Sequence, residues 1–253
     1  MKTGIIVQAR MGSERLPGKV MLNIDENPML FYVINQLRYC KLADVIIIAT
    51  TSNKEDDVIE KYTKSQNIEC FRGNDGDVLD RYYQCAKKYN ISTIVRITCD
   101  DPLIDPVIVD QTIRKFYSDD FDFVTNRMSR TFPFGTEVDV FSFESFSNLW
   151  KKAKKPSERE HVIPYYYNNS HDFSIFNISN PENLSHLSWS VDRKNDLLFV
   201  REIVLRIKNR PILMNDILLL LKKEPKLMQI NSNRIPDEGY LKSLDEDKSK
   251  GFV

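Results

Sequence analysis

The strongest constraint on the fold is a repeated alternation of short apolar strands and helical patterns through the first half of the chain. The strands are continuous apolar runs, which is typical of strands buried on both faces of a sheet. Ser52 with Glu55 forms a capping-box pattern that predicts one helix start, and Asp105 before Pro106 predicts another. This alternation predicts an α/β fold with a mostly parallel, helix-covered sheet. The expected strands are residues 3–8, 44–50, 68–72 and 92–98, and the expected helices include residues 28–40 and 76–89.

The order of elements changes in the second half of the chain. Strands are expected at residues 121–125 and 137–141, with residues 126–190 forming an insertion on the sheet rather than a separate domain. The tail from about residue 209 reads as helical and polar, and its end at residues 245–250 is expected to fray. We therefore expect the 253 residues, 1–253, to form a single domain, since one α/β unit of this length can bury a large core.

A cationic, glycine-bearing loop follows the first expected strand, at residues 8–19. Gly12 and Gly18 allow turns that expose backbone N–H groups, and the basic side chains add donors suited to phosphate oxygens. The loop is not a Walker P-loop, because five residues separate the glycines and Val20 follows the lysine. Taken alone, it predicts a triphosphate-binding loop, with a solvated basic turn as the alternative. Its basic residues are Arg10, Arg15 and Lys19.

Acidic residues follow two later apolar segments. Asp100 and Asp101 come directly after the strand expected at residues 92–98, and Asp192 follows a Trp-Ser-Val run. Carboxylates that face a basic loop are suited to hold Mg²⁺, which bridges them to phosphate oxygens. Turn formation and helix capping are the alternatives. Of the later pair, Asp192 is the candidate metal ligand, while Asp196 suits the first turn of a helix, where its charge favours the dipole.

Three further segments carry polar groups with more than one possible role. The loop at residues 72–77 is suited to contact a base or ribose, or simply to open a helix. The segment at residues 130–139 mixes aromatic, cationic and acidic groups that suit a sugar acid, or it forms a plain hairpin. Ser157 with Glu160 satisfies a capping box, which gives Glu160 a structural explanation. Arg159 and His161, in the same segment, remain available for a ligand, with a packed side chain as the alternative for His161.

Charge and composition argue against several classes of protein. The 36 basic residues balance the 36 acidic ones, so no global field draws the chain to nucleic acid or to an anionic membrane. No run approaches the roughly 20 apolar residues of a membrane span, and no apolar signal region begins the chain. The four cysteines form no CxxC pair and only three histidines are present, so a zinc site is not expected. We expect a cytoplasmic protein with reduced thiols.

Several motifs appear together and in one order. They are QARMGSERLPGK at residues 8–19, RG at 72–73 with DVLDRYY at 77–83, RITCDDPLIDP at 96–106, REHVIPY at 159–165 and WSVD at 189–192. With these motifs, the chain resembles the cytidylyltransferase family that activates acidic sugars, acylneuraminate and ketodeoxyoctonate among them. It resembles most closely the spore-coat polysaccharide biosynthesis branch of that family, over nearly the whole length of the chain. A single motif of this kind is a weak signal, whereas five in register are a strong one.

The resemblance implies a Rossmann-like nucleotidyltransferase sheet with a smaller dimerisation and sugar-binding extension. It implies Mg²⁺-dependent transfer of CMP from CTP to a nonulosonic acid type of sugar, with release of pyrophosphate, for surface polysaccharide biosynthesis. The implied partners are CTP, the small acidic sugar and a second copy of the chain in a homodimer. Thr98 and Cys99 depart from the sialic acid and ketodeoxyoctonate synthetases, so the resemblance leaves the preferred base open.

The loops and the resemblance together give a set of candidate site residues. The catalytic candidates are Arg10, Arg15, Lys19 and Asp100, and the metal-binding candidates are Asp100 and Asp192. The nucleotide-binding candidates are Ala9, Arg10, Met11, Gly12, Ser13, Arg15, Lys19, Arg72, Asn74, Asp77, Thr98 and Asp100. The candidates for binding the acceptor are Arg130, Glu137, Arg159 and His161.

Three other functions fit parts of the same pattern. A nucleotidyltransferase acting on a sugar phosphate or polyol phosphate would use the same loop and metal. A glycosyltransferase would share a related sheet but commonly carries a DxD pair, whereas this chain has Asp100-Asp101-Pro102. A catalytically inactive nucleotide-binding regulator is the alternative from another class of protein.

Overall fold

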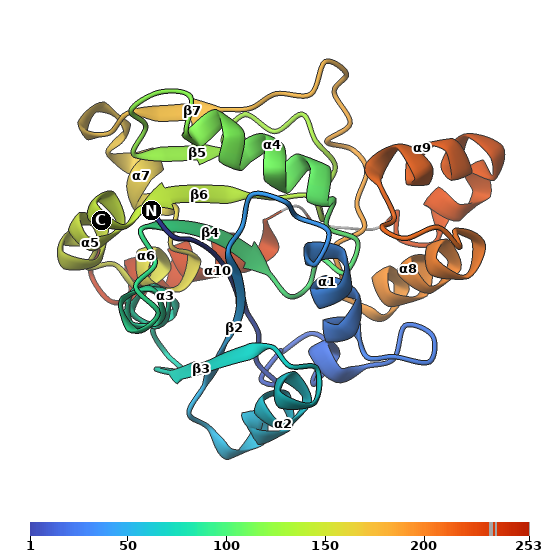
Figure 1. Cartoon of the computed structure of the whole chain (residues 1–253), viewed down its shortest axis with the longest axis horizontal. Coiled ribbons are helices and arrows are strands. Elements are labelled where there is room, and N and C mark those ends of the chain that lie inside the picture. Colours follow the sequence, from blue (N-terminus) through green and yellow to red (C-terminus); the bar gives the residue numbers. More distant parts are fainter. Residues whose placement is uncertain (233–234, 236, 253) are drawn as a thin grey trace.

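The strands of this computed structural model lie in one sheet (Figure 1). The structure describes residues 1–232, 235 and 237–252. The strands are β1 (Thr3–Gln8), β2 (Val45–Thr51), β3 (Glu69–Gly73), β4 (Thr93–Thr98), β5 (Phe123–Thr125), β6 (Asp139–Ser142) and β7 (Ile175–Asn177). Their order in the sheet is β3-β2-β1-β4-β6-β5-β7, and only β6 runs antiparallel to its neighbours among these described strands. The mostly parallel α/β sheet expected from the sequence is confirmed.

Side chains of the central strand β1 alternate between two hydrophobic cores. Ile5 and Val7 are fully buried in one core and Ile6 in the other, since successive side chains of a strand point to opposite faces. The first core is covered by α1 (Met29–Leu37), α2 (Asp57–Ser65), α4 (Pro106–Phe116), α8 (Lys194–Arg206) and α9 (Met214–Lys223). The second is covered by α3 (Val78–Lys88), α5 (Phe143–Lys152) and α7 (Pro164–Asn168), with α6 (Pro156–His161) packed on α3. Short 3₁₀ helices occupy Lys19–Met21, Lys54–Asp56, Ser170–Asp172 and Pro225–Gln229, and α10 (Glu238–Ser249) follows.

Three segments that are far apart in the sequence meet at the carboxyl edge of the sheet. Gln8 at the end of β1 pairs in register with Thr98 at the end of β4, so the loops that follow these strands start side by side. The backbone N–H of Val191 donates to the carbonyl of Asp100 at 2.8 Å, which brings the Trp-Ser-Val-Asp segment to the same edge. This is the edge at which parallel α/β sheets bind ligands.

The segment at residues 126–190 is partly built into the sheet. It supplies β6 and β7, and Asp139 of β6 accepts a hydrogen bond from the guanidinium of Arg96 in β4 at 2.9 Å. Both side chains are buried, so this ion pair joins the segment to the middle of the sheet. Its proposed part in dimerisation remains a prediction.

The two predicted helix starts had different outcomes. The side chain of Asp105 accepts from the backbone N–H of Val107 at 2.8 Å with Pro106 in the first turn, as predicted. The capping box at Ser52 is wrong, because the following 3₁₀ helix starts after Asn53 and Ser52 is exposed. The buried carboxylate of Asp56 organises this turn instead, by accepting from the hydroxyl and backbone N–H of Thr51.

The expected fraying at residues 245–250 is also wrong. These residues lie largely in α10, whose Asp247 is only 3% exposed. The carboxylate of Asp247 accepts from the backbone N–H of Ser157 at 3.0 Å and from the hydroxyl of the same residue. Asp247, a buried acid that accepts two hydrogen bonds from one residue, therefore holds α10 against α6. The polar composition of the segment does not reveal this contact.

Two further findings concern the expectations about membrane spans and cysteines. No helix within residues 1–232 or 237–252 is long and apolar enough to cross a membrane. All four cysteines are free thiols, and burial raises the pKa of each.

Candidate functional site

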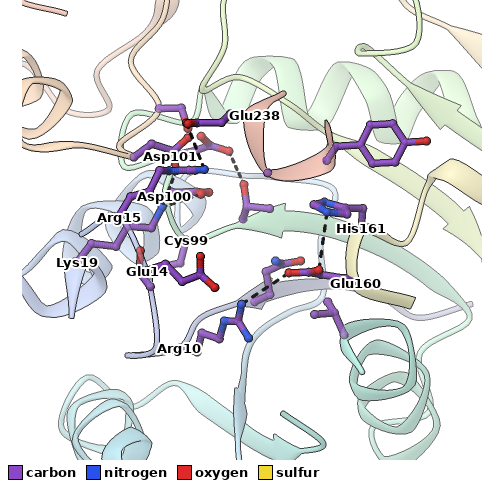
Figure 2. A pocket seen from close by; sticks show the side chains of 18 of the residues that line it. Arg10, Glu14, Arg15, Lys19, Cys99, Asp100, Asp101, Glu160, His161 and Glu238 are labelled. Atoms are coloured by element: carbon purple, nitrogen blue, oxygen red, sulfur yellow. Dashed lines mark hydrogen bonds and ion pairs between the residues drawn. The ribbon is translucent and has the colours of Figure 1, made fainter. Parts of the chain in front are cut away.

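A cavity of about 360 Å³ opens at the carboxyl edge of β1 and β4. Its walls come from the basic loop after β1, the acidic turn after β4, the segment before α8, the end of α6, and α10 (Figure 2). Lys19 and Arg15 lie beside Asp100 and Glu238 in this cavity, whereas Arg10 lies beside Glu160. The tertiary fold therefore gathers charged groups of both signs in one hollow.

Backbone hydrogen bonds give the basic loop its shape. The N–H groups of Ser13 and Gly18 both donate to the carbonyl of Met11, at 2.8 and 2.9 Å. Gly18 has a φ of 67°, in the left-handed region that glycine adopts without strain. The N–H of Met11 donates to the carboxylate of Asp56 at 2.7 Å, which ties the loop to the start of α2. The loop is thus preformed, with its cationic side chains on the cavity side.

Lys19 joins the basic loop to both acidic segments. Its ammonium lies 3.0 Å from a carboxylate oxygen of Asp100, 3.0 Å from one of Asp192 and 2.8 Å from the carbonyl of Val191. Arg15 also contacts Asp192, at 2.7 Å. Burial opposes ionisation of Asp192, but the charges of Lys19 and Arg15 outweigh it and lower the pKa of that carboxyl to about 2. Burial likewise opposes the charge on Lys19, but the two carboxylates raise the pKa of its ammonium above the ordinary value.

Asp100 and Asp192 are placed to share one cation. Both carboxylates contact the same ammonium, so the two oxygens converge on a single point of positive charge. Among the described residues, no group of three or more His, Cys, Asp and Glu side chains is placed to hold a metal ion. Mg²⁺ typically uses one or two carboxylates together with substrate phosphates, so this pair fits it.

The neighbouring Asp101 has a different character. Its side chain is 2% exposed, and it accepts a hydrogen bond from the hydroxyl of Thr98 at 2.6 Å. Burial, and then the charge of Asp100, raise the pKa of Asp101 well above its ordinary value. Burial that disfavours the charged form of a carboxyl also makes that carboxyl a poorer ligand for a hard cation. Asp100 is therefore the better ligand of the adjacent pair.

The structure brings most of the predicted residues to the cavity, but not all. Those that line it are Ala9, Arg10, Gly12, Ser13, Arg15, Lys19, Thr98, Asp100, Glu137, His161 and Asp192. Those that do not line it are Met11, Arg72, Asn74, Asp77, Arg130 and Arg159.

Specific contacts explain the residues that lie elsewhere. Arg72 pairs with Asp57 and Glu60 at 2.6 and 2.7 Å, which turns its guanidinium toward α2. Asp77 caps α3 by accepting from the N–H of Asp80, and its carboxylate also pairs with Arg159. The carboxamide oxygen of Asn74 accepts a hydrogen bond from the N–H of Gly76 at 3.0 Å. The guanidinium of Arg130 lies 3.7 Å from the ring centre of Phe134 and pairs with Glu137. Met11 packs its side chain against the first core.

Several residues of the cavity wall were not identified from the sequence. Arg81 of α3 is 1% exposed, and its Nε has no hydrogen-bond partner among the described residues. Arg96 interrupts the apolar strand Ile94-Val95-Arg96-Ile97, a pattern that could have marked it as a site residue. Arg127 also lines the cavity, and its guanidinium lies 3.9 Å from Asp139.

The predicted capping box of Ser157 and Glu160 is wrong. Helix α6 follows Lys155, and its first turn is closed by Glu158, which accepts from the backbone N–H groups of Lys154 and Lys155 at 3.1 and 3.2 Å. The carboxylate of Glu160 instead lies 3.8 Å from the guanidinium of Arg10 and lines the cavity (Figure 2). Glu160 is thus a further acidic residue of the site.

Comparison with known proteins places this geometry in a family. The family model described as cytidylyltransferase matches residues 4–235. The spore coat polysaccharide biosynthesis protein SpsF of Bacillus subtilis is 28% identical over 87% of this chain and 94% of its own length. A 3-deoxy-manno-octulosonate cytidylyltransferase of Trichlorobacter lovleyi is 31% identical over 46% of this chain and 45% of its own length. A cytidylyltransferase structure from Leptospira borgpetersenii superposes with a TM-score of 0.88 at 32% identity, covering 93% of this chain and 98% of the other. This chain belongs to the cytidylyltransferase family.

Proposed function

We propose that this cytidylyltransferase transfers CMP from CTP to the anomeric hydroxyl of a 2-keto sugar acid, with release of pyrophosphate, for the synthesis of a surface polysaccharide. The observation that carries the proposal is the contact of Lys19 with both Asp100 and Asp192 in a cavity at the end of β1 and β4. This arrangement provides cationic donors for a triphosphate and two carboxylates for a divalent cation at one place.

The side chains of the basic loop would bind and orient the triphosphate. Arg10, Arg15 and Lys19 neutralise charge on its oxygens, and the preformed loop reduces the cost of ordering them. Asp100 and Asp192 would hold Mg²⁺, which supplies positive charge where negative charge develops on the phosphates. No protein nucleophile is needed, because such transfer depends mainly on positioning and electrostatic stabilisation.

The acidic character of the acceptor is supported by three guanidinium groups of the cavity wall that have few carboxylate partners. Arg96 and Arg127 both face the single carboxylate of Asp139, at 2.9 and 3.9 Å. Arg81 has no ion pair with a described residue, and its burial lowers the pKa of its guanidinium. These groups favour a substrate that brings its own carboxylate. The partly matching relative from Trichlorobacter lovleyi is named for an acidic sugar as well.

A pyrophosphate-release screen tests the proposal. CTP, GTP, UTP and ATP are offered with sialic, legionaminic and pseudaminic acids, ketodeoxyoctonate and several sugar phosphates, each with and without Mg²⁺. The expected result is release with CTP and one sugar acid, dependent on the divalent cation. Pyrophosphate release with a sugar phosphate but with none of the sugar acids would contradict the proposed acceptor and would indicate a sugar phosphate as the acceptor. Stabilisation by CTP without pyrophosphate from any acceptor would indicate a nucleotide-binding regulator.

A further inference from the structure

Helix α10 lies beyond the segment that matches the family model, yet it forms one wall of the cavity. The matched segment ends at residue 235 and α10 begins at Glu238. Arg193 pairs with Glu238 at 2.8 Å, and Lys242 pairs with Glu14 of the basic loop. In Figure 1, α10 runs beside α6 at the end of the chain. The lining residues of α10 are Glu238, Gly239, Tyr240, Lys242, Ser243 and Glu246.

The face of α10 that packs on α6 buries polar groups in defined contacts. Ser243 and Asp247 are 4% and 3% exposed. Asp247 holds the start of α6 through the backbone N–H and the hydroxyl of Ser157, as described above. Ser243 lies one turn earlier on the same face and contacts the end of α6. The two residues therefore fix α10 at both ends of that short helix.

The hydroxyl of Ser243 connects Glu160 of the cavity wall to His161, which is a candidate for binding the acceptor. It donates to the carboxylate of Glu160 at 2.9 Å and lies 2.9 Å from Nε2 of His161. A serine hydroxyl has one proton, and an ionised carboxylate only accepts hydrogen bonds. The carbonyl of Gly239, at 3.2 Å, is a second acceptor that competes for the same proton. Nε2 of His161 must then be the donor to Ser243, which fixes its ring as the Nε2–H tautomer.

Other contacts hold the His161 ring in this arrangement. The ring of Tyr240 meets it edge to face, with 5.4 Å between ring centres. Val162, the next residue, has a φ of 71°, a strained value for a β-branched side chain that its complete burial maintains. Burial lowers the pKa of His161 to about 4, so the ring is neutral at physiological pH and one nitrogen keeps a free lone pair. Within the described residues, Nδ1 has no hydrogen-bond partner.

We propose that α10 belongs to the acceptor site, and that Ser243 is a positioning residue that holds His161 as the Nε2–H tautomer, so that Nδ1 accepts a hydrogen bond from a hydroxyl of the acceptor sugar. The part played by the sugar rests on the proposed function, whereas the tautomer and its dependence on Ser243 do not. The recognised chemistry is a neutral hydroxyl donor, next to the guanidinium groups that favour an acidic sugar.

The first experiment reads the tautomer directly. The three histidines, His161, His171 and His186, are labelled with ¹⁵N in their rings, and long-range ¹H–¹⁵N spectra are recorded at pH 7, with assignments from His→Gln variants. The expected result is the Nε2–H form at His161 in the unaltered protein and a mixture of both tautomers in Ser243→Ala. Ser249→Ala is the matched control, since that serine is exposed on α10, and its spectrum should equal that of the unaltered protein. An Nδ1–H form in the unaltered protein, or an unchanged spectrum in Ser243→Ala, overturns the proposal.

The second experiment tests the link to the acceptor. With the sugar acid that passes the pyrophosphate screen, Ser243→Ala should raise the acceptor KM about tenfold, the effect of losing one well-placed hydrogen bond. The Kd for CTP, measured by calorimetry without acceptor, should stay within twofold. An unchanged acceptor KM overturns the link. If the tautomer result holds while no acceptor supports release, the proposed function fails and the assignment of Ser243 as the group that positions His161 stands.

Discussion

The ammonium of Lys19 lies 3.0 Å from a carboxylate oxygen of Asp192, a residue 173 positions further along the chain. This contact joins two walls of the cavity, because Lys19 belongs to the loop after β1 and Asp192 to the segment before α8. Asp100, after β4, completes the cluster at the same distance. One ammonium therefore links the three chain segments on which nucleotide binding is proposed to depend.

Replacing either carboxylate should remove most of the activity. Asp100→Asn and Asp192→Asn should each lower kcat/KM at least about a hundredfold, which corresponds to about 3 kcal/mol of barrier, because the divalent cation loses a charged ligand. Pyrophosphate release at saturating Mg²⁺ is the measurement. Asp120→Asn, an exposed substitution of the same kind, serves as the control and should keep full activity. Near-full turnover of Asp100→Asn would refute the metal assignment.

Lys19→Met should make the fold respond more strongly to Mg²⁺. Without the ammonium, Asp100 and Asp192 repel each other, and the pKa of Asp192 should rise from its value of about 2. A divalent cation that binds both carboxylates then stabilises the folded state by mass action. Thermal unfolding with 0 and about 10 mM MgCl₂ measures this, with a larger rise in Tm for Lys19→Met than for the unaltered chain. Equal rises in both proteins would argue against a cation at this pair.

Asp139→Asn should destabilise the protein strongly. Its carboxylate faces the guanidiniums of Arg96 and Arg127 and accepts from the hydroxyl of Thr125 at 2.7 Å, at a position only 1% exposed. Removing the charge leaves two cations without their counter-ion, which typically costs about 3–5 kcal/mol of unfolding free energy. Urea denaturation gives the value, and the exposed Asp120→Asn should change it by less than about 0.5 kcal/mol. A loss as small as that of the control would show that the pair contributes little to stability.

Stability should fall as the pH drops from about 6.5 toward 4. Burial lowers the pKa of folded His161 to about 4 from an ordinary 6.5, so in this window the unfolded chain binds more protons than the folded one. The free energy of unfolding therefore rises with pH through this window, and the contribution of His161 to it is lost on acidification. Urea titrations at pH 7, 6 and 5 measure the slope. His161→Gln should flatten it, while the exposed His171→Gln should leave it unchanged. The same slope in His161→Gln would exclude this residue as the cause.

The parallel sheet and the charged turns at its carboxyl edge could be predicted because their signals are local. Continuous apolar runs define β1, β2 and β4, and the basic loop and Asp100 stand directly after such runs. Parallel strands bring those loops to one edge whatever the packing of the helices. The positions of Arg72 and Asp77 could not be predicted in this way, because each has a partner of opposite charge on a helix. Acidic residues of α2 pair with Arg72, and a basic residue of α6 pairs with Asp77. Their guanidinium and carboxylate charges pair there, outside the cavity.

The sequence by itself determined the α/β architecture, the phosphate-suited loop at residues 8–19 and its family. These follow from the periodicity of apolar residues and from short motifs whose chemistry does not depend on distant contacts. Only the tertiary structure decided that Glu160 faces the cavity, that Asp77 and Arg159 pair, and that α10 forms part of the wall. The contacts of Ser243 with Glu160 and His161 join residues 83 and 82 positions apart in the sequence. Asp77 and Arg159 are also 82 positions apart. No local pattern encodes such separations, because they depend on how α3, α6 and α10 pack.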